Sequence, residues 1–417
     1  MIEAETRSLD DLLSDCVHCG FCLPACPTYK SWGSEADSPR GRIDLMKALN
    51  EGVLGAEDVA PHLDRCLGCM ACVPACPSGV RYDLLIETMR ARVEGEIARP
   101  AEDRALRELV FATFPYPERL RALALPLFFA QRIGLFELLR KSGLLARLPA
   151  RLAQFARLAP PLDVGAPSAT LPERTPARGA QRGTVALVAG CVQRVFFPDV
   201  NRATIRVLAA EGFEVVVPPR QGCCGALSLH AGREREAQRF AGDLVERFAG
   251  EPFDAVIVNA AGCGSTLKEY GNLLGERGFG FAPRVRDINE FLAEVGTVAP
   301  QRALRLRVAY HDACHLANAQ RIREQPRALL RAIPELELVE IPGNEGCCGS
   351  AGVYNLLQPE SAKEIGLRRL AALRSLDVDL VASANPGCTL QLQALAAERG
   401  ERLRAAHPIE LLDAALA

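Results

Sequence analysis

The 417-residue sequence predicts an α+β protein of several domains, with a helical N-terminal domain followed by two repeated α/β domains. All sixteen cysteines fall into four groups of four, and the second group follows the first at a spacing of 50 residues. The fourth group follows the third at spacings of 123 to 125 residues. Short apolar runs alternate with helical patterns around these last two groups, which is typical of parallel sheets covered by helices. Two internal duplications explain this arrangement.

The composition points to an ordinary globular chain with an unusual number of thiols. It has 49% hydrophobic and 24% charged residues, and the net charge of −2 gives no reason to expect a nucleic-acid partner. The beginning, MIEAETRSLDDLLSD, lacks the basic segment and apolar run of a signal peptide. Since disulfide frameworks are typical of small secreted chains, we expect a cytoplasmic protein with metal-bound thiolates.

Residues 1–100 are predicted to form one domain that carries the same cysteine motif twice. Both copies have the pattern C-x2-C-x2-C-x3-C-P, the bacterial ferredoxin signature for [4Fe–4S] clusters. In this signature the fourth cysteine of each run ligates the other cluster. We therefore predict two clusters, held by Cys16, Cys19, Cys22 and Cys76 and by Cys66, Cys69, Cys72 and Cys26. Zinc is the alternative, but it favours two separated C-x2-C pairs.

The segment between the two motifs is longer than a minimal ferredoxin needs. Residues 38–50 and 57–65 have helical patterns, so the domain is predicted to be an expanded, helical, ferredoxin-like unit. Gly41 and Arg42 either turn the chain near a cluster or, for Arg42, simply place a solvated charge at a helix start.

Residues 101–182 contain no cysteine and are predicted to form a basic, helical connector. Eight basic residues stand between Arg119 and Arg157, against the single acidic residue Glu137. The apolar run 122–130 is interrupted by Pro126 and is far shorter than the ~20 residues of a membrane span. These helices either pack on the protein's own domains, which we prefer, or bind a membrane surface or a partner. Residues 158–182 have the composition of a linker.

Residues 183–303 and 304–417 are predicted to be two copies of an α/β cysteine-rich domain. The predicted strands are 184–189, 214–219, 253–264, 306–314, 336–342 and 380–388, and the predicted helices are 198–212, 232–249, 325–333 and 359–375. The cysteines follow the strands, and ligands of parallel sheets gather beyond the carboxyl ends of the strands. Each copy is therefore expected to hold four thiols on one rim: Cys191, Cys223, Cys224 and Cys263, and Cys314, Cys347, Cys348 and Cys388. We prefer a further iron–sulfur cluster at each, with zinc or free thiols as alternatives.

Four polar residues lie close to these cysteines in the sequence: His230, His311, Asp312 and His315. A proton relay or an added metal ligand is one hypothesis for them. A lone histidine is more often a hydrogen-bonded polar residue, and we prefer that interpretation for each histidine.

These motifs resemble two related families. The paired segments GCCGA at 222–226 and CCGSAGVY at 347–354 resemble the CCG domain of heterodisulfide reductase catalytic subunits. The whole order, with CVHCGFCLPACPTY at 16–29, DSPRGRI at 37–43, HLDRCLGC at 62–69, CPSGVRY at 76–82, and GCG with KEYG within 262–271, resembles the iron–sulfur subunit of glycolate oxidase. One departure concerns the C-x2-C pair that ends the heterodisulfide reductase pattern. Its first cysteine is replaced by Ala260 and Asn385, which puts that family's cluster and disulfide chemistry in doubt here.

The resemblance implies an electron-transfer subunit. A flavoprotein partner would oxidise glycolate, and this chain would pass the electrons to a quinone or another acceptor. We find no G-x-G-x-x-G fingerprint after a strand, so FAD and substrate are expected on partner chains and no catalytic residue is assigned here. Equivalent subunits of lactate or glycerol 3-phosphate dehydrogenases, and a thiol–disulfide reductase, are the alternatives. A further alternative is that the cytoplasmic chain associates peripherally with the inner face of the cell membrane.

Overall fold

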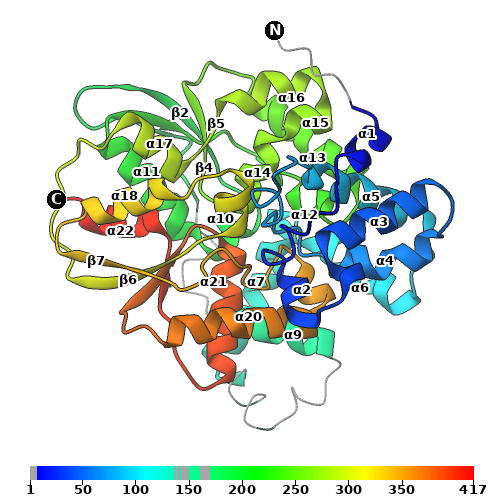
Figure 1. Ribbon diagram of the computed structural model, residues 1–417. Helices are drawn as coiled ribbons and strands as arrows, with labels where there is room; N and C mark the ends of the chain where they lie inside the picture. The colour runs from blue at the N-terminus through cyan, green and yellow to red at the C-terminus, as the bar shows by residue number, and fades with distance from the viewer. Residues whose placement is uncertain (1–6, 136–137, 139–141, 143–149, 160–169) are drawn as a thin grey trace.

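The computed structural model describes residues 7–135, 138, 142, 150–159 and 170–417. It has the predicted architecture of a helical N-terminal domain followed by two α/β domains (Figure 1). The apolar faces of the N-terminal helices meet in one core around Met46, Leu63 and Leu85. The predicted helices 38–50 and 57–65 are α3 and α4. The helices of this domain are α1 (Leu9–Ser14), α2 (Pro27–Trp32), α3 (Pro39–Asn50), α4 (Ala56–Arg65) and α5 (Tyr82–Glu96).

The connector helices lie across both α/β domains. They are α6 (Ala101–Thr113), α7 (Pro117–Arg132) and α9 (Ala150–Leu158), while residues 136–137, 139–141, 143–149 and 160–169 of the predicted connector lie outside the described residues. Phe111 of α6 packs against Leu356 in the second copy, and Leu120 of α7 packs against Val195 in the first. The described part of the connector therefore packs on the protein's own domains. No described helix is long and apolar enough to span a membrane.

Each α/β domain is built on a largely parallel sheet. The first sheet has the strand order β1-β3-β2-β4-β5 and the second β7-β6-β8-β9. Only β1 is antiparallel, and it comes from the segment predicted as a linker, so the end of that linker is an edge strand. The strands are β1 (Arg174–Thr175), β2 (Gly183–Val188), β3 (Phe213–Val216), β4 (Ala255–Val258), β5 (Val285–Asp287), β6 (Leu306–His311), β7 (Leu336–Glu340), β8 (Leu380–Ser383) and β9 (Ala405–Ala406).

The helices alternate with these strands, as predicted. In the first copy they are α10 (Val192–Phe196), α11 (Pro198–Ala210), α12 (Ala226–Leu229), α13 (Glu234–Arg247), α14 (Ala261–Lys268), α15 (Tyr270–Leu274), α16 (Glu276–Phe281) and α17 (Ile288–Val295). In the second copy they are α18 (Glu324–Ala332), α19 (Tyr354–Leu357), α20 (Pro359–Arg374), α21 (Pro386–Glu398) and α22 (Pro408–Ala415). Short 3-10 turns and one π-helical turn, His315–Ala319, complete the list.

The two copies pack on each other through equivalent helices. Helix α11 of the first copy packs against α22 of the second, and α17 of the first packs against α18 of the second (Figure 1). The two sheets share one apolar core, to which Leu187 of β2 and Val308 of β6 both belong. Arg206 and Asp413 add an ion pair of 2.6 Å across this interface. The duplication thus gives a pseudo-twofold pair of domains.

The glycine after each cysteine pair is required by the backbone. Gly225 and Gly349 have φ of 85° and 86°, in the left-handed region that favours glycine. A Cβ on Gly225 would lie 2.9 Å from the carbonyl oxygen of Ala237, and a Cβ on Gly349 would collide with the equivalent oxygen of Ala362. Each cysteine loop therefore packs directly on the backbone of the second helix that follows it, which is α13 in the first copy and α20 in the second.

We predict that Gly349→Ala lowers the free energy of unfolding by about 2 kcal/mol or more, because it combines a left-handed φ with a backbone collision. Denaturant titration of the purified protein measures this change. Gly222→Ala is the matched control in the other loop: its φ is outside the left-handed region and no neighbouring atom lies within 4 Å of its Cβ position. Equal effects of the two substitutions would contradict this account of the loop.

Candidate iron–sulfur and cysteine sites

The two ferredoxin-type loops have matching backbones. In the first loop His18 and Gly20 have φ of 55° and 83°, and 50 residues later Gly68 and Met70 have φ of 61° and 55°. The left-handed residues turn the chain between cysteines, and in the second loop the amide of Gly68 donates a hydrogen bond of 3.4 Å to the Cys66 Sγ. The loops thus turn their sulfurs and amides toward one place, as holding a metal group requires.

The cysteines of the two loops intermix. One cleft is lined by five of them: Cys16, Cys19, Cys22, Cys72 and Cys76. Cys26 of the first loop lies among the electrostatic neighbours of Cys69 and Cys72 in the second. Cys76 therefore lies with the first three cysteines of the first run, together with Cys72 of its own run, and Cys26 lies near Cys69 and Cys72 of the second. The cysteines of the two runs are thus brought together, and the crossed ligand sets stay a prediction from the spacing.

Buried positive charge stands beside the second set. Arg42 is 1% exposed and donates hydrogen bonds to the backbone oxygen of His62, at 2.7 Å, and to Thr28. Burial raises the pKa of Cys66, but the guanidinium groups of Arg42 and Arg90, together with hydrogen bonds from Gly68 and Tyr82, outweigh this and leave its pKa lowered. Arg42 is therefore a buried partner of the cysteine site and not a solvated charge at a helix start. A buried cation favours a group of thiolates.

In each α/β copy the four cysteines gather at the carboxyl end of the sheet. Cys263 and Cys388 are the third residues of α14 and α21, where helix N-termini favour thiolates. The Cys191 Sγ lies 3.5 Å from the Cys223 Sγ. The amides of Gly225 and Gly349 donate equivalent hydrogen bonds of 3.4 Å to the first sulfur of each pair.

Burial and crowding shift the ionisation of these thiols. Hydrogen bonds from the Cys223 and Cys263 thiols lower the pKa of Cys224. In the second copy the hydrogen bond with Cys347 and burial hold the pKa of Cys314 above the usual range. One thiol hydrogen bond lowers the pKa of Cys347 and of Cys348, but a second neighbouring thiol and burial outweigh it and leave both raised. Crowded, buried sulfurs with backbone amides directed at them are a donor set that suits a bound metal group, which keeps its thiols deprotonated.

Both sets open onto one shared cavity of about 610 Å³. The amide of Ala261 donates a hydrogen bond of 3.0 Å to the carbonyl oxygen of Ala384, which joins the sheet ends of the two copies beside it. Side chains of α7 and α9, including Leu123 and Phe155, line its other side. The cysteines that line it are Cys191, Cys223, Cys224, Cys263, Cys314, Cys348 and Cys388.

The N-terminal domain reaches the second cysteine-rich copy directly. Cys69 packs in one apolar cluster with Cys314 and Cys347. The Asn318 side chain donates a hydrogen bond of 3.1 Å to the backbone oxygen of Cys69. Trp32 of α2 donates one of 3.1 Å to Glu364 of α20. The second ferredoxin-type set and the second copy's set are therefore neighbours.

Two of the histidines have hydrogen-bond partners, as predicted. His230 contacts Glu87 at 3.0 Å, and His315 contacts the Ser265 hydroxyl at 2.6 Å. The two rings lie 4.9 Å apart on the wall of the cavity. Burial and the neighbouring His230 lower the pKa of His315 to about 3, so its imidazole is neutral.

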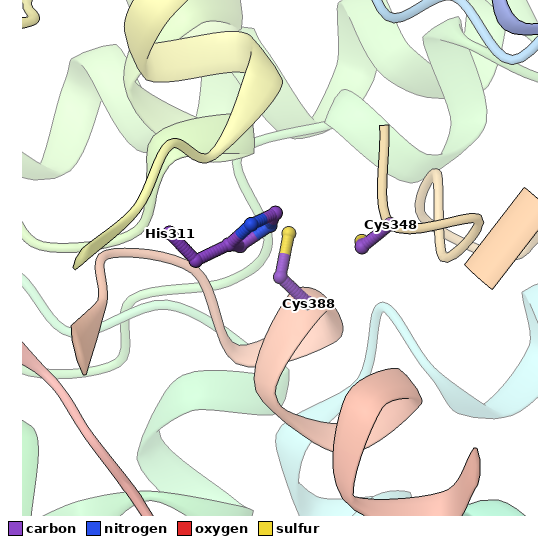
Figure 2. Close-up of side chains that lie close together, drawn as sticks. All are labelled: His311, Cys348 and Cys388. Carbon is purple, nitrogen blue, oxygen red and sulfur yellow. The ribbon is translucent and has the colours of Figure 1, made fainter. Parts of the chain in front are cut away.

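His311 differs from this expectation. It is 1% exposed, and neither ring nitrogen has a hydrogen-bond partner among the residues that the structure describes. Burial and the nearby Arg369 lower its pKa to about 3. One of its ring nitrogens and the sulfurs of Cys348 and Cys388 all lie within 4.8 Å of one another (Figure 2). Asp312, by contrast, is held by Arg327 at 2.9 Å.

Sequence reasoning missed three of these features: the shared cavity, the contact between Cys69 and the second copy, and the unpartnered His311. The first two depend on how domains pack, for which the sequence gives no signal. The third feature had a signal in the sequence. At the repeat spacing of 123 residues, His311 of the second copy is equivalent to Val188 of the first, so a histidine stands where the first copy has a valine.

Three family models match four segments of the chain. The cysteine-rich domain matches residues 185–268 and 308–393, the 4Fe-4S dicluster domain matches residues 12–80, and the linker region of the glycolate oxidase iron-sulfur subunit matches residues 102–159. The N-terminal domain is therefore a 4Fe-4S dicluster domain, and the two repeats are cysteine-rich domains.

Three relatives put these matches in context. The chain is 37% identical to the probable glycolate oxidase iron-sulfur subunit of Bacillus subtilis, over 98% of this chain and 95% of that protein. It is 34% identical to the glycolate oxidase iron-sulfur subunit of Escherichia coli, over 99% and 96%. It is 25% identical to lactate utilization protein A of Oceanobacillus iheyensis, over 55% and 96%. Given the near full-length similarity to the first two, the chain belongs to the family of glycolate oxidase iron-sulfur subunits.

Proposed function

We propose that this chain is the electron-transfer subunit of a flavin-dependent, glycolate-oxidising complex. A partner flavoprotein would carry FAD and oxidise glycolate, and this chain would deliver the electrons to a quinone or another acceptor. Membership of the family and the cysteine sets, which reach from an accessible loop to the interior, support this role. The contact of Cys69 with Cys314 and Cys347 is the observation that carries the proposal.

We assign two [4Fe–4S] clusters to the N-terminal domain, with the crossed ligand sets predicted from the sequence. Cys16, Cys19, Cys22 and Cys76 would hold one, in agreement with the cleft that they share. Cys66, Cys69, Cys72 and Cys26 would hold the other, next to the buried Arg42. When bound, such clusters supply one-electron transfer.

In this proposal the different exposure of the two N-terminal cysteine sets gives the order in which they would receive electrons. Cys19 is exposed, and the neighbouring Val17 and Phe21 are each 66% exposed, so a partner can approach the first set from solvent. In the second set Cys26, Cys66 and Cys69 are buried, and Cys69 packs against the second cysteine-rich copy.

The eight remaining cysteines would hold further metal groups, either iron–sulfur clusters or zinc. They are Cys191, Cys223, Cys224, Cys263, Cys314, Cys347, Cys348 and Cys388. The largely apolar cavity, which all of them except Cys347 line, also supports an apolar acceptor such as a quinone. Helix α7, which lines the cavity, exposes Leu125 and Phe129, and this supports contact of that side with a membrane or a partner.

A lactate-oxidising complex is the second candidate. The similarity to a lactate utilization protein favours it, although that similarity covers 55% of this chain. A thiol–disulfide reductase is disfavoured, because Ala260 and Asn385 stand where that chemistry has a further cysteine.

We expect the flavoprotein that copurifies with this chain to reduce an artificial electron acceptor with glycolate as substrate. Parallel assays with lactate and glycerol 3-phosphate provide the comparison, with the flavoprotein alone as the control. Activity with lactate only would transfer the proposal to the second candidate. Activity with glycerol 3-phosphate only would exclude both.

We predict about eight irons and eight labile sulfides per chain, or more, in protein purified anaerobically, because each of two [4Fe–4S] clusters contributes four of each. Iron, zinc and sulfide analysis measures this content. A colourless protein that contains zinc and gives no reducible EPR signal would refute the cluster assignment.

We predict that Cys72→Ser perturbs a cluster of the N-terminal domain and blocks electron transfer to the acceptor, while glycolate still reduces the partner's flavin. Stopped-flow absorbance of the complex separates the two steps. Ser78→Ala, at another residue lining the same cleft, is the control and should leave both steps intact. Loss of flavin reduction in Cys72→Ser would contradict the proposed division of labour.

A further inference from the structure

The two cysteine-rich copies differ at one pair of residues in the sheet. In the first copy Val188 of β2 is paired with Val258 of β4. In the second copy the equivalent pair is His311 of β6 and Ser383 of β8. Cross-strand partners lie on the same face of a sheet, so two polar side chains replace two apolar ones at the same place. All four residues are buried, with exposed fractions of 2% or less.

The polar pair has no hydrogen-bond partners. Both ring nitrogens of His311 and the hydroxyl of Ser383 are buried and unpaired among the described residues. Buried polar atoms in folded proteins are nearly always paired, because an unpaired one loses its contacts with water and gains nothing in return. Three unpaired atoms at one pair of strand ends therefore indicate that a bound group is their partner.

The neighbours of His311 identify the chemistry of that group. The imidazole and the sulfurs of Cys348 and Cys388 lie within 4.8 Å of one another, which is about twice a metal–ligand bond length. Figure 2 shows the ring lying beside the Cys388 sulfur, with Cys348 opposite. In the first copy Val188 packs beside Cys224 and offers no ligand atom. Neutral imidazole and thiolate together suit zinc or iron.

We propose that His311 is a metal ligand that only the second copy possesses. Its imidazole nitrogen would bind one metal atom together with the Cys348 and Cys388 thiolates, and that atom would be Zn²⁺ or an iron of a cluster. This rests on the proposed metal content of the second copy. The two copies would then hold different groups, one bound by thiolates alone and one by thiolates and imidazole. If the metal is iron, imidazole ligation raises its reduction potential relative to the thiolate-bound group.

The test compares three full-length, anaerobically purified proteins: the unsubstituted chain, His311→Val and His407→Asn. Valine is the residue of the first copy, so His311→Val should fold. His407 is an equally buried imidazole that accepts the Ile409 amide at the start of α22, and asparagine retains an N-cap acceptor. Metal analysis, zinc-edge X-ray absorption and pulsed EPR of the reduced protein are the readouts.

We expect His311→Val to remove either the nitrogen ligand of bound zinc or the large hyperfine coupling of an iron-bound nitrogen. We expect His407→Asn to change neither. His311→Cys should restore metal binding and, for iron, lower the reduction potential of that group. An unchanged spectrum and metal content in His311→Val would overturn the proposal, as would equal losses in His407→Asn. Absence of metal from the second copy would also overturn the proposal. If the irons of the N-terminal domain were still present and reducible, the proposed function of the chain would stand.

Discussion

The rest of the structure depends on the close approach of the carboxyl ends of two parallel sheets. Helix pairs α11–α22 and α17–α18 hold the two copies together, and the hydrogen bond from Ala261 to Ala384 joins their sheet ends. Since every strand of the parallel ladders ends at the same edge, the cysteines that follow the strands must meet at this junction. The connector then closes the cavity with α7 and α9. The two copies of the cysteine-rich domain thus form one shared cavity that is lined by cysteines of both.

The N-terminal domain breaks this pseudo-symmetry. It places Cys69 against Cys314 and Cys347 of the second copy, with Asn318 binding the Cys69 backbone. Toward the first copy it makes polar contacts instead, from Arg90 to the backbone oxygen of His230 and from Glu87 to its ring. Both copies therefore contact the dicluster domain, but it is the second copy whose cysteines pack against one of that domain's cysteines. Their equal cysteine patterns do not make them equivalent in an electron path.

Most of the fold was predictable because its signals are local. The cysteine spacings fixed the repeats, and the apolar runs before Cys191 and Cys388 located β2 and β8. Features that depend on tertiary packing were not predictable. Arg174 and Thr175 form an edge strand within an expected linker, because their partner β3 lies far along the sequence. The burial of Arg42 follows from its contacts with Thr28 and His62, which no helical pattern could reveal.

At several positions near the sulfurs, the second copy has a residue of a different kind from its equivalent in the first copy. Asn385 donates a hydrogen bond of 3.5 Å to the Cys388 sulfur and accepts one of 3.3 Å from the Gly262 amide, whereas its equivalent Ala260 has no side-chain donor. Pro386 lacks the amide by which its equivalent Ala261 binds the opposite sheet, so this hydrogen bond runs in one direction only. The polar pair His311 and Ser383 likewise belongs to the second copy. The copy whose cysteines pack against Cys69 of the dicluster domain is therefore the one that carries these polar residues, and this is where a duplicated site would take on chemistry of its own.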